Sequence, residues 1–133
     1  MDLSKGKILL IDDDETVHSV LRYHMGRAGF TLLSAKDSEM AMQAIHREPD
    51  LLTVLIDIHL PRPDLGWALL DSLCKLKDTL LVGTAIVVYS IDDDKARTRI
   101  AGADVHFIKP VNYKDLIALI ENYADQRSKA EHQ

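Results

Sequence analysis

The amino-acid sequence predicts an α/β fold, a three-layer sandwich in which five helices cover the two faces of an open, five-stranded parallel sheet. Short apolar runs of strand length recur along the chain, and longer segments with helical spacing lie between them. Gly29 and Gly102 fall where two of these helices should stop, as glycine commonly does at helix ends. Strands that alternate with helices favour parallel pairing, because each helix carries the chain back across the sheet.

The first half of the chain contains three predicted strands and two predicted helices. The first strand is predicted at Lys7–Ile11, where an apolar run ends in acidic residues. A helix follows at Thr16–Arg27, whose apolar residues recur three and four positions apart. A weaker apolar run predicts the second strand at Phe30–Ser34, and a second periodic segment predicts a helix at Ser38–His46. The third strand is predicted at Leu51–Ile56.

The second half continues this alternation. Leucines at helical spacing predict the third helix at Trp67–Lys77, and the fourth strand is predicted at Ala85–Tyr89. Asp92–Ala101 predicts a short polar helix with an acidic first turn, where the helix dipole favours anions. The fifth strand is predicted at Val105–Ile108, and apolar residues at helical spacing predict the last helix at Tyr113–Ala124.

The composition is that of a globular protein of the cytoplasm. The 133 residues suffice for one domain, predicted at residues 1–125 and followed at 126–133 by a polar C-terminal tail or linker stump. The net charge of −5 argues against direct binding of nucleic acid. The single cysteine, Cys74, excludes an internal disulfide and fits a reducing compartment. The sequence has no signal-peptide pattern and no run of about 18 apolar residues, which predicts a cytoplasmic protein without a membrane span.

Chemically active side chains follow four of the predicted strands. Asp12 and Asp13 follow the first strand, Asp57 the third, Ser90 the fourth and Lys109 the fifth. Because the carboxyl ends of parallel strands meet at one edge of a sheet, these side chains are expected to converge there. Two carboxylates about 4 Å apart repel one another by about 4 kcal/mol at an effective dielectric of about 20. Carboxylates are ligands that Mg²⁺ prefers, so a Mg²⁺ ion is predicted to offset this repulsion.

Four short motifs mark these strand ends, LLIDDDE, LIDIHLP, VVYS and GADVHFIKP in this order. Together they resemble the receiver domain of two-component response regulators, the family of the bacterial chemotaxis response regulator. The resemblance covers the chain from about Lys7 to about Tyr123. It implies a flavodoxin-like sheet with the strand order 2-1-3-4-5.

The resemblance also implies a role for each residue of the predicted acidic cluster, which consists of Asp12, Asp13 and Asp57. Asp57 would accept a phosphoryl group from a histidine of a sensor histidine kinase or a histidine phosphotransfer protein. Asp12, Asp13 and Asp57 would hold Mg²⁺, together with the backbone carbonyl of His59. Phosphoryl transfer needs the charge on the phosphoryl oxygens neutralised, which a metal ion and a lysine supply. The chain would not act as an enzyme beyond accepting the phosphoryl group and dephosphorylating itself.

A switch at the ends of the fourth and fifth strands is implied as well. Lys109 would pair with Asp57 and then with the phosphoryl oxygens, and Ser90 would hydrogen-bond the phosphoryl group. His106, three residues before Lys109, stands where the family usually has a tyrosine or phenylalanine that moves inward on phosphorylation. Phe107 follows it, but the alternation of strand residues points Phe107 to the other face.

Other departures from the family pattern surround the predicted site. Ile91 follows Ser90 where the family mostly has a small residue, and it is expected to narrow access to Asp57. After Pro61 the segment RPDLGWALL is one residue longer than the family pattern, which alters the loop beside the site. Pro49 is spaced more widely than usual from the third-strand aspartate. None of these changes removes a chemical group that the site requires.

The implied function is a two-component phosphorelay in which phosphorylation switches protein–protein interactions. Besides the phosphodonor protein, the implied partner is a downstream output domain or protein. The sequence leaves open whether the chain forms a phosphorylation-dependent homodimer through the surface of the fourth and fifth helices. No output domain accompanies the receiver motifs, which predicts either a stand-alone regulator or the receiver of a larger protein. Direct binding to nucleic acid or to a membrane is not expected.

Two functions from other classes compete with this interpretation. A degenerate receiver, which binds proteins without being phosphorylated, stays open because Ile91 and His106 depart from the family, although the full set of site residues argues against it. A phosphatase of the haloacid-dehalogenase type is disfavoured, since His59 stands where its general acid is needed, two residues after Asp57. A flavin-binding flavodoxin is a neighbour at the level of the fold only, since the sequence lacks a Ser/Thr/Gly-rich phosphate loop after the first strand.

The remaining polar and aromatic residues are assigned structural roles. Asp14 and Asp92–Asp94 are expected to cap helices or face water. Cys74 and Trp67 are expected to pack as apolar side chains of a helix. Three histidines on predicted helices are expected to be surface or half-buried residues and not ligands, namely His18, His24 and His46.

Overall fold

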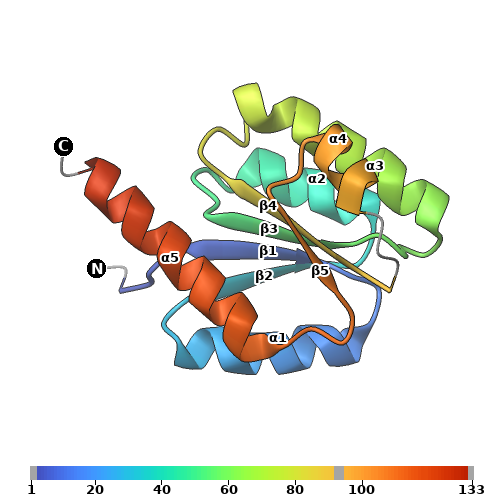
Figure 1. The fold of residues 1–133 in the computed structure, drawn as a ribbon. Coiled ribbons are helices and arrows are strands. Elements are labelled where there is room, and N and C mark those ends of the chain that lie inside the picture. Colours follow the sequence, from blue (N-terminus) through green and yellow to red (C-terminus); the bar gives the residue numbers. More distant parts are fainter. Residues whose placement is uncertain (1–2, 92–94, 132–133) are drawn as a thin grey trace.

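The computed structural model describes residues 3–91 and 95–131, and a five-stranded sheet forms its centre (Figure 1). Its strands are β1 (Lys7–Ile11), β2 (Thr31–Ala35), β3 (Thr53–Asp57), β4 (Ala85–Ser90) and β5 (Val105–Ile108). All neighbouring strands pair in parallel, in the order β2-β1-β3-β4-β5. The fold class and the strand order predicted from the sequence are therefore confirmed.

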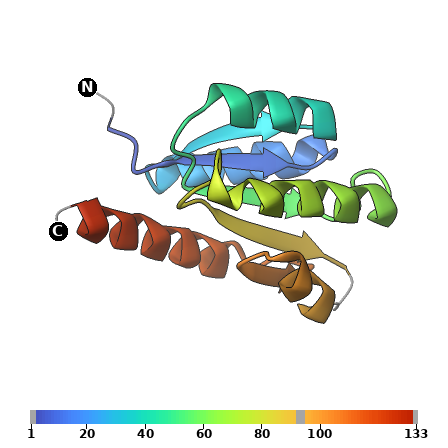
Figure 2. The same cartoon turned by 90° about the horizontal axis from the view of Figure 1, so that it is seen from above.

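The helices form a layer on each face of the sheet. They are α1 (Glu15–Arg27) and α5 (Tyr113–Glu131) on one face, and α2 (Ser38–Arg47), α3 (Pro63–Lys75) and α4 (Lys95–Ala101) on the other (Figure 1). Figure 2, the view from above, shows that the first and last described segments lie at the end of the sheet opposite to the carboxyl ends of the strands. Both described ends of the chain therefore lie away from the carboxyl edge of the sheet (Figure 2).

Two hydrophobic cores fill the space between the layers, because successive strand residues point to opposite faces. In β1, Leu9 and Ile11 belong to the core beneath α2 and α3, whereas Ile8 and Leu10 belong to the core beneath α1 and α5. All four side chains are fully buried. Burial on both faces explains why the central strands β1, β3 and β4 are mostly apolar in the sequence.

The third helix begins earlier than predicted. The sequence predicts its start at Trp67, but α3 begins at Pro63 and ends at Lys75, where a 3-10 turn at Leu76–Asp78 continues the chain. Proline suits the first turn of a helix, because its fixed φ is helical and its missing N–H needs no partner there. Trp67 itself is buried in the core beneath α2 and α3, as expected for a packing residue.

The last helix is longer than predicted. It runs to Glu131 and not to Ala124, so residues 126–131 of the segment predicted as a polar tail or linker stump belong to this helix. Arg127 accounts for this extension, since its guanidinium group docks the helix on two distant loops. It donates hydrogen bonds of 2.9 to 3.0 Å to three backbone carbonyls, those of Asp50, Leu51 and Gly83.

β1 and β5 have the predicted bounds, and the remaining elements differ from theirs by a few residues. β3 starts at Thr53 and not at Leu51, and it includes Asp57, while β4 extends to Ser90. The predicted fourth helix begins at Asp92–Asp94, which lie outside the described residues. Among the helices of the described part, none is both long and apolar enough to cross a membrane.

Gly66 in α3 lies directly against the loop that follows β3. A β-carbon at this position would be 1.6 Å from the carbonyl oxygen of Ile58. We expect the Gly66→Ala protein to lose about 3 kcal/mol of unfolding free energy, because the backbone must shift to accommodate the methyl group. Chemical denaturation measures this loss. Gly26→Ala in α1 is the control, since its β-carbon would meet nothing within 4 Å, and equal stability of the two variants would contradict the close approach.

Candidate functional site

The predicted acidic residues meet at the carboxyl edge of the sheet. Asp57 is the last residue of β3, and Asp12 directly follows β1, the strand next to it. These two residues are 4% and 1% exposed, whereas Asp13 is exposed. One carboxylate oxygen from each of the three residues lies within 4.8 Å of the other two. The structure therefore brings together three side chains that are distant in the sequence.

Lys109 supplies a positive charge beside these carboxylates. It follows β5, and its Nζ donates a hydrogen bond to Oδ2 of Asp57 at 2.9 Å. Its backbone N–H donates to the carbonyl of Ser90 at 2.9 Å, which ties the end of β5 to the end of β4. Oδ1 of Asp57 accepts a hydrogen bond from the backbone N–H of His59 at 3.0 Å. Both oxygens of the Asp57 carboxylate are thus held in place.

Asp12 is fixed by a residue that the sequence did not single out. Its Oδ1 accepts a hydrogen bond from the backbone N–H of Asp14 at 2.8 Å, and its Oδ2 accepts one from the hydroxyl of Tyr89. Burial raises the pKa of Asp12 above its ordinary value, and these two hydrogen bonds oppose that shift. Tyr89 is 77 positions away in the chain, so no local pattern indicates the contact.

A buried histidine supports the segment that carries Asp12. His18, which was expected at the surface or half-buried, is fully buried in α1. Its Nε2 lies 2.6 Å from the carbonyl oxygen of Asp12, and its Nδ1 lies 2.9 Å from Oγ of Ser34 in β2. Because a carbonyl oxygen only accepts, Nε2 carries a proton and donates it. The ring thereby links the end of β1 to β2, which explains its burial.

Ser90 and His106, the predicted switch residues, lie on the strands at one side of the cluster. Ser90 is the last residue of β4 and is fully buried. His106 in β5 is half-buried, with Nδ1 2.9 Å from Oγ1 of Thr98 in α4. Phe107 packs against the opposite core beneath α1 and α5, as the alternation of strand residues predicts. The contact between His106 and Thr98 connects β5 to α4.

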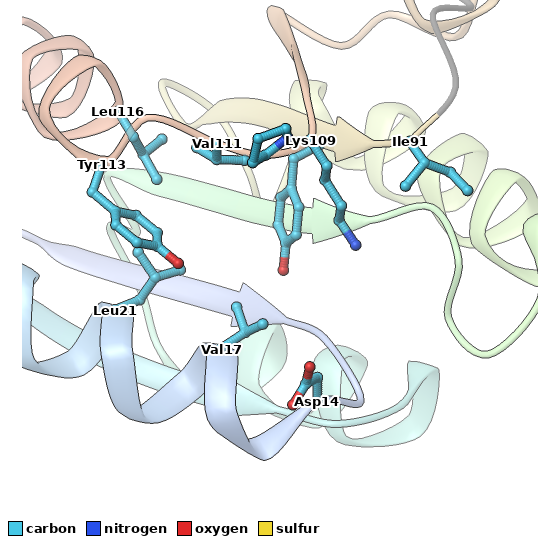
Figure 3. A pocket seen from close by; sticks show the side chains of 10 residues that line it. Asp14, Val17, Leu21, Ile91, Lys109, Val111, Tyr113 and Leu116 are labelled. Carbon is cyan, nitrogen blue, oxygen red and sulfur yellow. The ribbon is translucent and has the colours of Figure 1, made fainter.

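An apolar pocket of about 630 Å³ adjoins the acidic cluster (Figure 3). Val17 of α1 and Tyr113 of α5 line it from facing sides, and Lys109 lines its upper edge. Tyr89 contributes to its wall. Ile91, which was expected to narrow access to Asp57, also lines this pocket and is 63% exposed.

The donor atoms of the acidic cluster fit a hard divalent cation. The group consists of carboxylates alone, and Mg²⁺ and Ca²⁺ take oxygen ligands of this kind. Three ionised carboxylates and the adjacent Lys109 ammonium carry a combined charge of −2 (−3 plus +1), which one divalent cation neutralises. The chemistry of the donor set thus agrees with the metal predicted from the sequence.

Comparison with known protein families gives a match over most of the chain. Residues 8–121 match the response regulator receiver domain, a range that includes every predicted site residue. The probable transcriptional regulator ycf27 of Porphyridium aerugineum is 30% identical over 128 residues, which cover 96% of this chain and 52% of that protein. The chain spans about half the length of the first curated relatives that it matches.

Solved structures of receiver domains have the same fold. A CheY-like receiver domain protein from Methanospirillum hungatei is 26% identical with a TM-score of 0.79, covering 94% of this chain and 98% of that one. A response regulator from Burkholderia pseudomallei, solved with a phosphorylated aspartic acid, a calcium ion and citrate, is 25% identical with a TM-score of 0.74, covering 95% of this chain and 72% of that one. The chain belongs to the response regulator receiver domain family.

Proposed function

We propose that this chain is a phosphoacceptor receiver domain, which takes a phosphoryl group onto Asp57 and thereby switches its protein–protein interactions. The main support for this proposal is the set of charged groups that surround Asp57. Its buried carboxylate lies beside two other carboxylates and 2.9 Å from the ammonium group of Lys109. The phosphorylated aspartic acid of the related Burkholderia pseudomallei protein supports the same chemistry here.

Mg²⁺ is the cation that we propose for the acidic cluster. Asp12, Asp13 and Asp57 would hold it through carboxylate oxygens, and the backbone carbonyl of His59 would be the fourth protein ligand. When bound, the ion neutralises charge on the oxygens of the phosphoryl group. The calcium ion of the Burkholderia pseudomallei structure is a hard divalent cation of the same class, which supports an oxygen-ligated metal at this kind of site.

The phosphoryl transfer follows from the groups around Asp57. A carboxylate oxygen of Asp57 forms a bond to phosphorus, and the bond from phosphorus to the donor histidine nitrogen breaks. The imidazole leaves with the bonding electron pair and takes up a proton from water, and the product on Asp57 is an acyl phosphate. Lys109 then pairs with the phosphoryl oxygens, and the hydroxyl of Ser90 donates a hydrogen bond to one of them. The chain catalyses only its own phosphorylation and dephosphorylation.

The proposed partners follow from the family. Response regulators act between histidine kinases and output domains or proteins, and several relatives are named transcriptional regulators. We propose a sensor histidine kinase or a histidine phosphotransfer protein as the phosphodonor, and an output domain or protein as the receiver of the signal. The contact between His106 and Thr98 would allow a conformational change at the phosphorylation site to reach α4. A homodimer formed through α4 and α5 after phosphorylation would use that route.

The proposal is tested by incubating the protein with Mg²⁺ and a small acyl phosphate or phosphoramidate, and by measuring its intact mass. We expect a gain of one phosphoryl group, which disappears when the metal is removed with a chelator. A protein that gains no mass with either donor would instead be a degenerate receiver. The complete set of Asp12, Asp13, Asp57, Ser90 and Lys109 favours the first outcome.

Asp13 tests the metal site without disturbing the fold. We expect Asp13→Ala to weaken Mg²⁺ binding by about tenfold or more, since loss of even a supporting residue commonly costs this much affinity. The unfolding free energy is expected to change by no more than about 0.5 kcal/mol, because the residue is exposed and its loss relieves repulsion among the carboxylates. Calorimetric titration measures the affinity. Asp71→Ala, an exposed acidic residue of α3, is the control, and equal affinities of the two variants would exclude Asp13 as a ligand.

A further inference from the structure

Tyr89 lies between two groups of the proposed phosphorylation site. It occupies the register position opposite Asp57 in the pairing of β3 with β4, and the two residues therefore point to the same face of the sheet. From there its hydroxyl reaches past the end of β3 and donates to Oδ2 of Asp12, at the end of β1. The Nζ of Lys109 lies 5.2 Å from the centre of its ring. One side chain thus contacts both a predicted metal ligand and the predicted phosphoryl-binding lysine.

The hydroxyl of Tyr89 is the donor in the hydrogen bond to Asp12. An ionised carboxylate oxygen only accepts, so the phenol supplies the proton of this hydrogen bond. The ring is 5% exposed, and it packs in the core beneath α1 and α5. A buried ring held on several sides keeps its hydroxyl in one place.

The hydrogen bond leaves room for a cation on Asp12. An ionised carboxylate offers about four lone-pair sites. The backbone N–H of Asp14 uses one of them on Oδ1, and the hydroxyl of Tyr89 uses one on Oδ2. Two lone-pair sites therefore remain for a cation, and one oxygen of this carboxylate lies within 4.8 Å of a carboxylate oxygen of Asp13 and of Asp57. The tyrosine therefore orients the carboxylate and does not compete with a metal ion for it.

We infer that Tyr89 is a positioning residue of the metal site, whose hydroxyl fixes the carboxylate of Asp12 for cation binding. The inference rests on the proposed function, because it assumes that the acidic cluster holds Mg²⁺. Groups that hydrogen-bond a metal ligand from outside commonly contribute 10- to 100-fold to metal affinity. Tyr89 therefore sets how much Mg²⁺ the chain needs, although it touches neither the ion nor the phosphoryl group.

Tyr89→Phe isolates the hydroxyl, because the ring, its packing and its contact with Lys109 remain. Tyr113→Phe makes the same chemical change in a second tyrosine of the adjoining pocket, whose ring stacks on His24. We expect calorimetry to give a dissociation constant for Mg²⁺ about tenfold higher for Tyr89→Phe than for the wild type, and an unchanged one for Tyr113→Phe. The Mg²⁺ concentration for half-maximal phosphorylation should rise by the same factor, while the rate at saturating Mg²⁺ should equal that of the wild type.

The possible results separate this inference from the proposed function. A Tyr89→Phe protein that binds Mg²⁺ as tightly as the wild type overturns the role of Tyr89 and leaves the proposed function intact. A loss of rate at saturating Mg²⁺ with unchanged affinity also overturns it, because the residue would then act on the transfer. A wild-type protein that does not bind Mg²⁺ contradicts the metal site itself, and with it this inference.

A measurement on the wild-type protein covers the case in which Tyr89→Phe does not fold. With the Cζ atoms of its 4 tyrosines labelled with carbon-13, the protein gives a signal from each phenol that responds to its hydrogen bond. The signal of one tyrosine is expected to shift during a Mg²⁺ titration. The midpoint of this shift should equal the midpoint of Mg²⁺ binding measured by calorimetry. Four signals that remain unchanged at saturating Mg²⁺ overturn the inference.

Discussion

The Asp57→Asn protein is expected to fold normally and to gain no phosphoryl group. Asparagine keeps the shape of the side chain but replaces the nucleophilic carboxylate oxygen with an amide, which cannot form the acyl phosphate. The substitution removes the ion pair with Lys109 and also removes one of three mutually repelling carboxylates, so the two effects on stability oppose one another. Intact-mass spectrometry after phosphodonor treatment measures the labelling, and thermal unfolding followed by circular dichroism measures the fold.

The matched control for this change is Asp64→Asn. Asp64 is an exposed residue in the first turn of α3, close in sequence to the loop after β3. We expect it to be labelled like the wild type. Labelling of Asp57→Asn at the wild-type level would place the phosphoryl group on another residue and reject the assignment of Asp57.

Replacement of Lys109 by alanine is expected to slow phosphorylation by about 100-fold at saturating Mg²⁺. Its ammonium lies 2.9 Å from Oδ2 of Asp57, where it can pair with the developing negative charge on the phosphoryl oxygens. Loss of one such preorganised donor commonly costs about 100- to 1000-fold in rate. The rate is measured by following the gain of mass with time.

Lys109→Arg separates the charge of the side chain from its shape. Arginine keeps the positive charge but replaces a compact ammonium with a planar fork, which does not fit the same position. We expect an intermediate rate for this variant. A Lys109→Ala protein that is phosphorylated at the wild-type rate would show that the ammonium takes no part in the transfer.

The three central strands, β1, β3 and β4, were predicted well because they are buried on both faces and therefore appear in the sequence as apolar runs. The bounds of β1 and β5 agree with the prediction. The start of α3 was missed because proline and glycine in RPDLG usually mark a loop, whereas Pro63 here occupies the first turn of the helix. The end of α5 was missed because Arg127 stabilises it through carbonyls of distant loops, which no local pattern reveals.

The candidate site was predictable where it depends on topology alone. Asp12 and Lys109 each follow a parallel strand and Asp57 ends one, and parallel strands bring such residues to one edge of the sheet. The contacts of Tyr89 and His18 with Asp12 could not be predicted in the same way. These contacts depend on which long side chains reach from one strand or helix to another, and the packing of the whole core determines this.

Chemical mapping of the phosphorylated residue tests the central claim most directly. Borohydride reduces an acyl phosphate to an alcohol and so converts a phosphoaspartate into homoserine, which peptide mass spectrometry locates. After treatment of the wild-type protein with phosphodonor and Mg²⁺, we expect homoserine at position 57 and at no other aspartate. Homoserine at Asp12 or Asp13, or a phosphoryl group found on a histidine of this chain, would contradict the account.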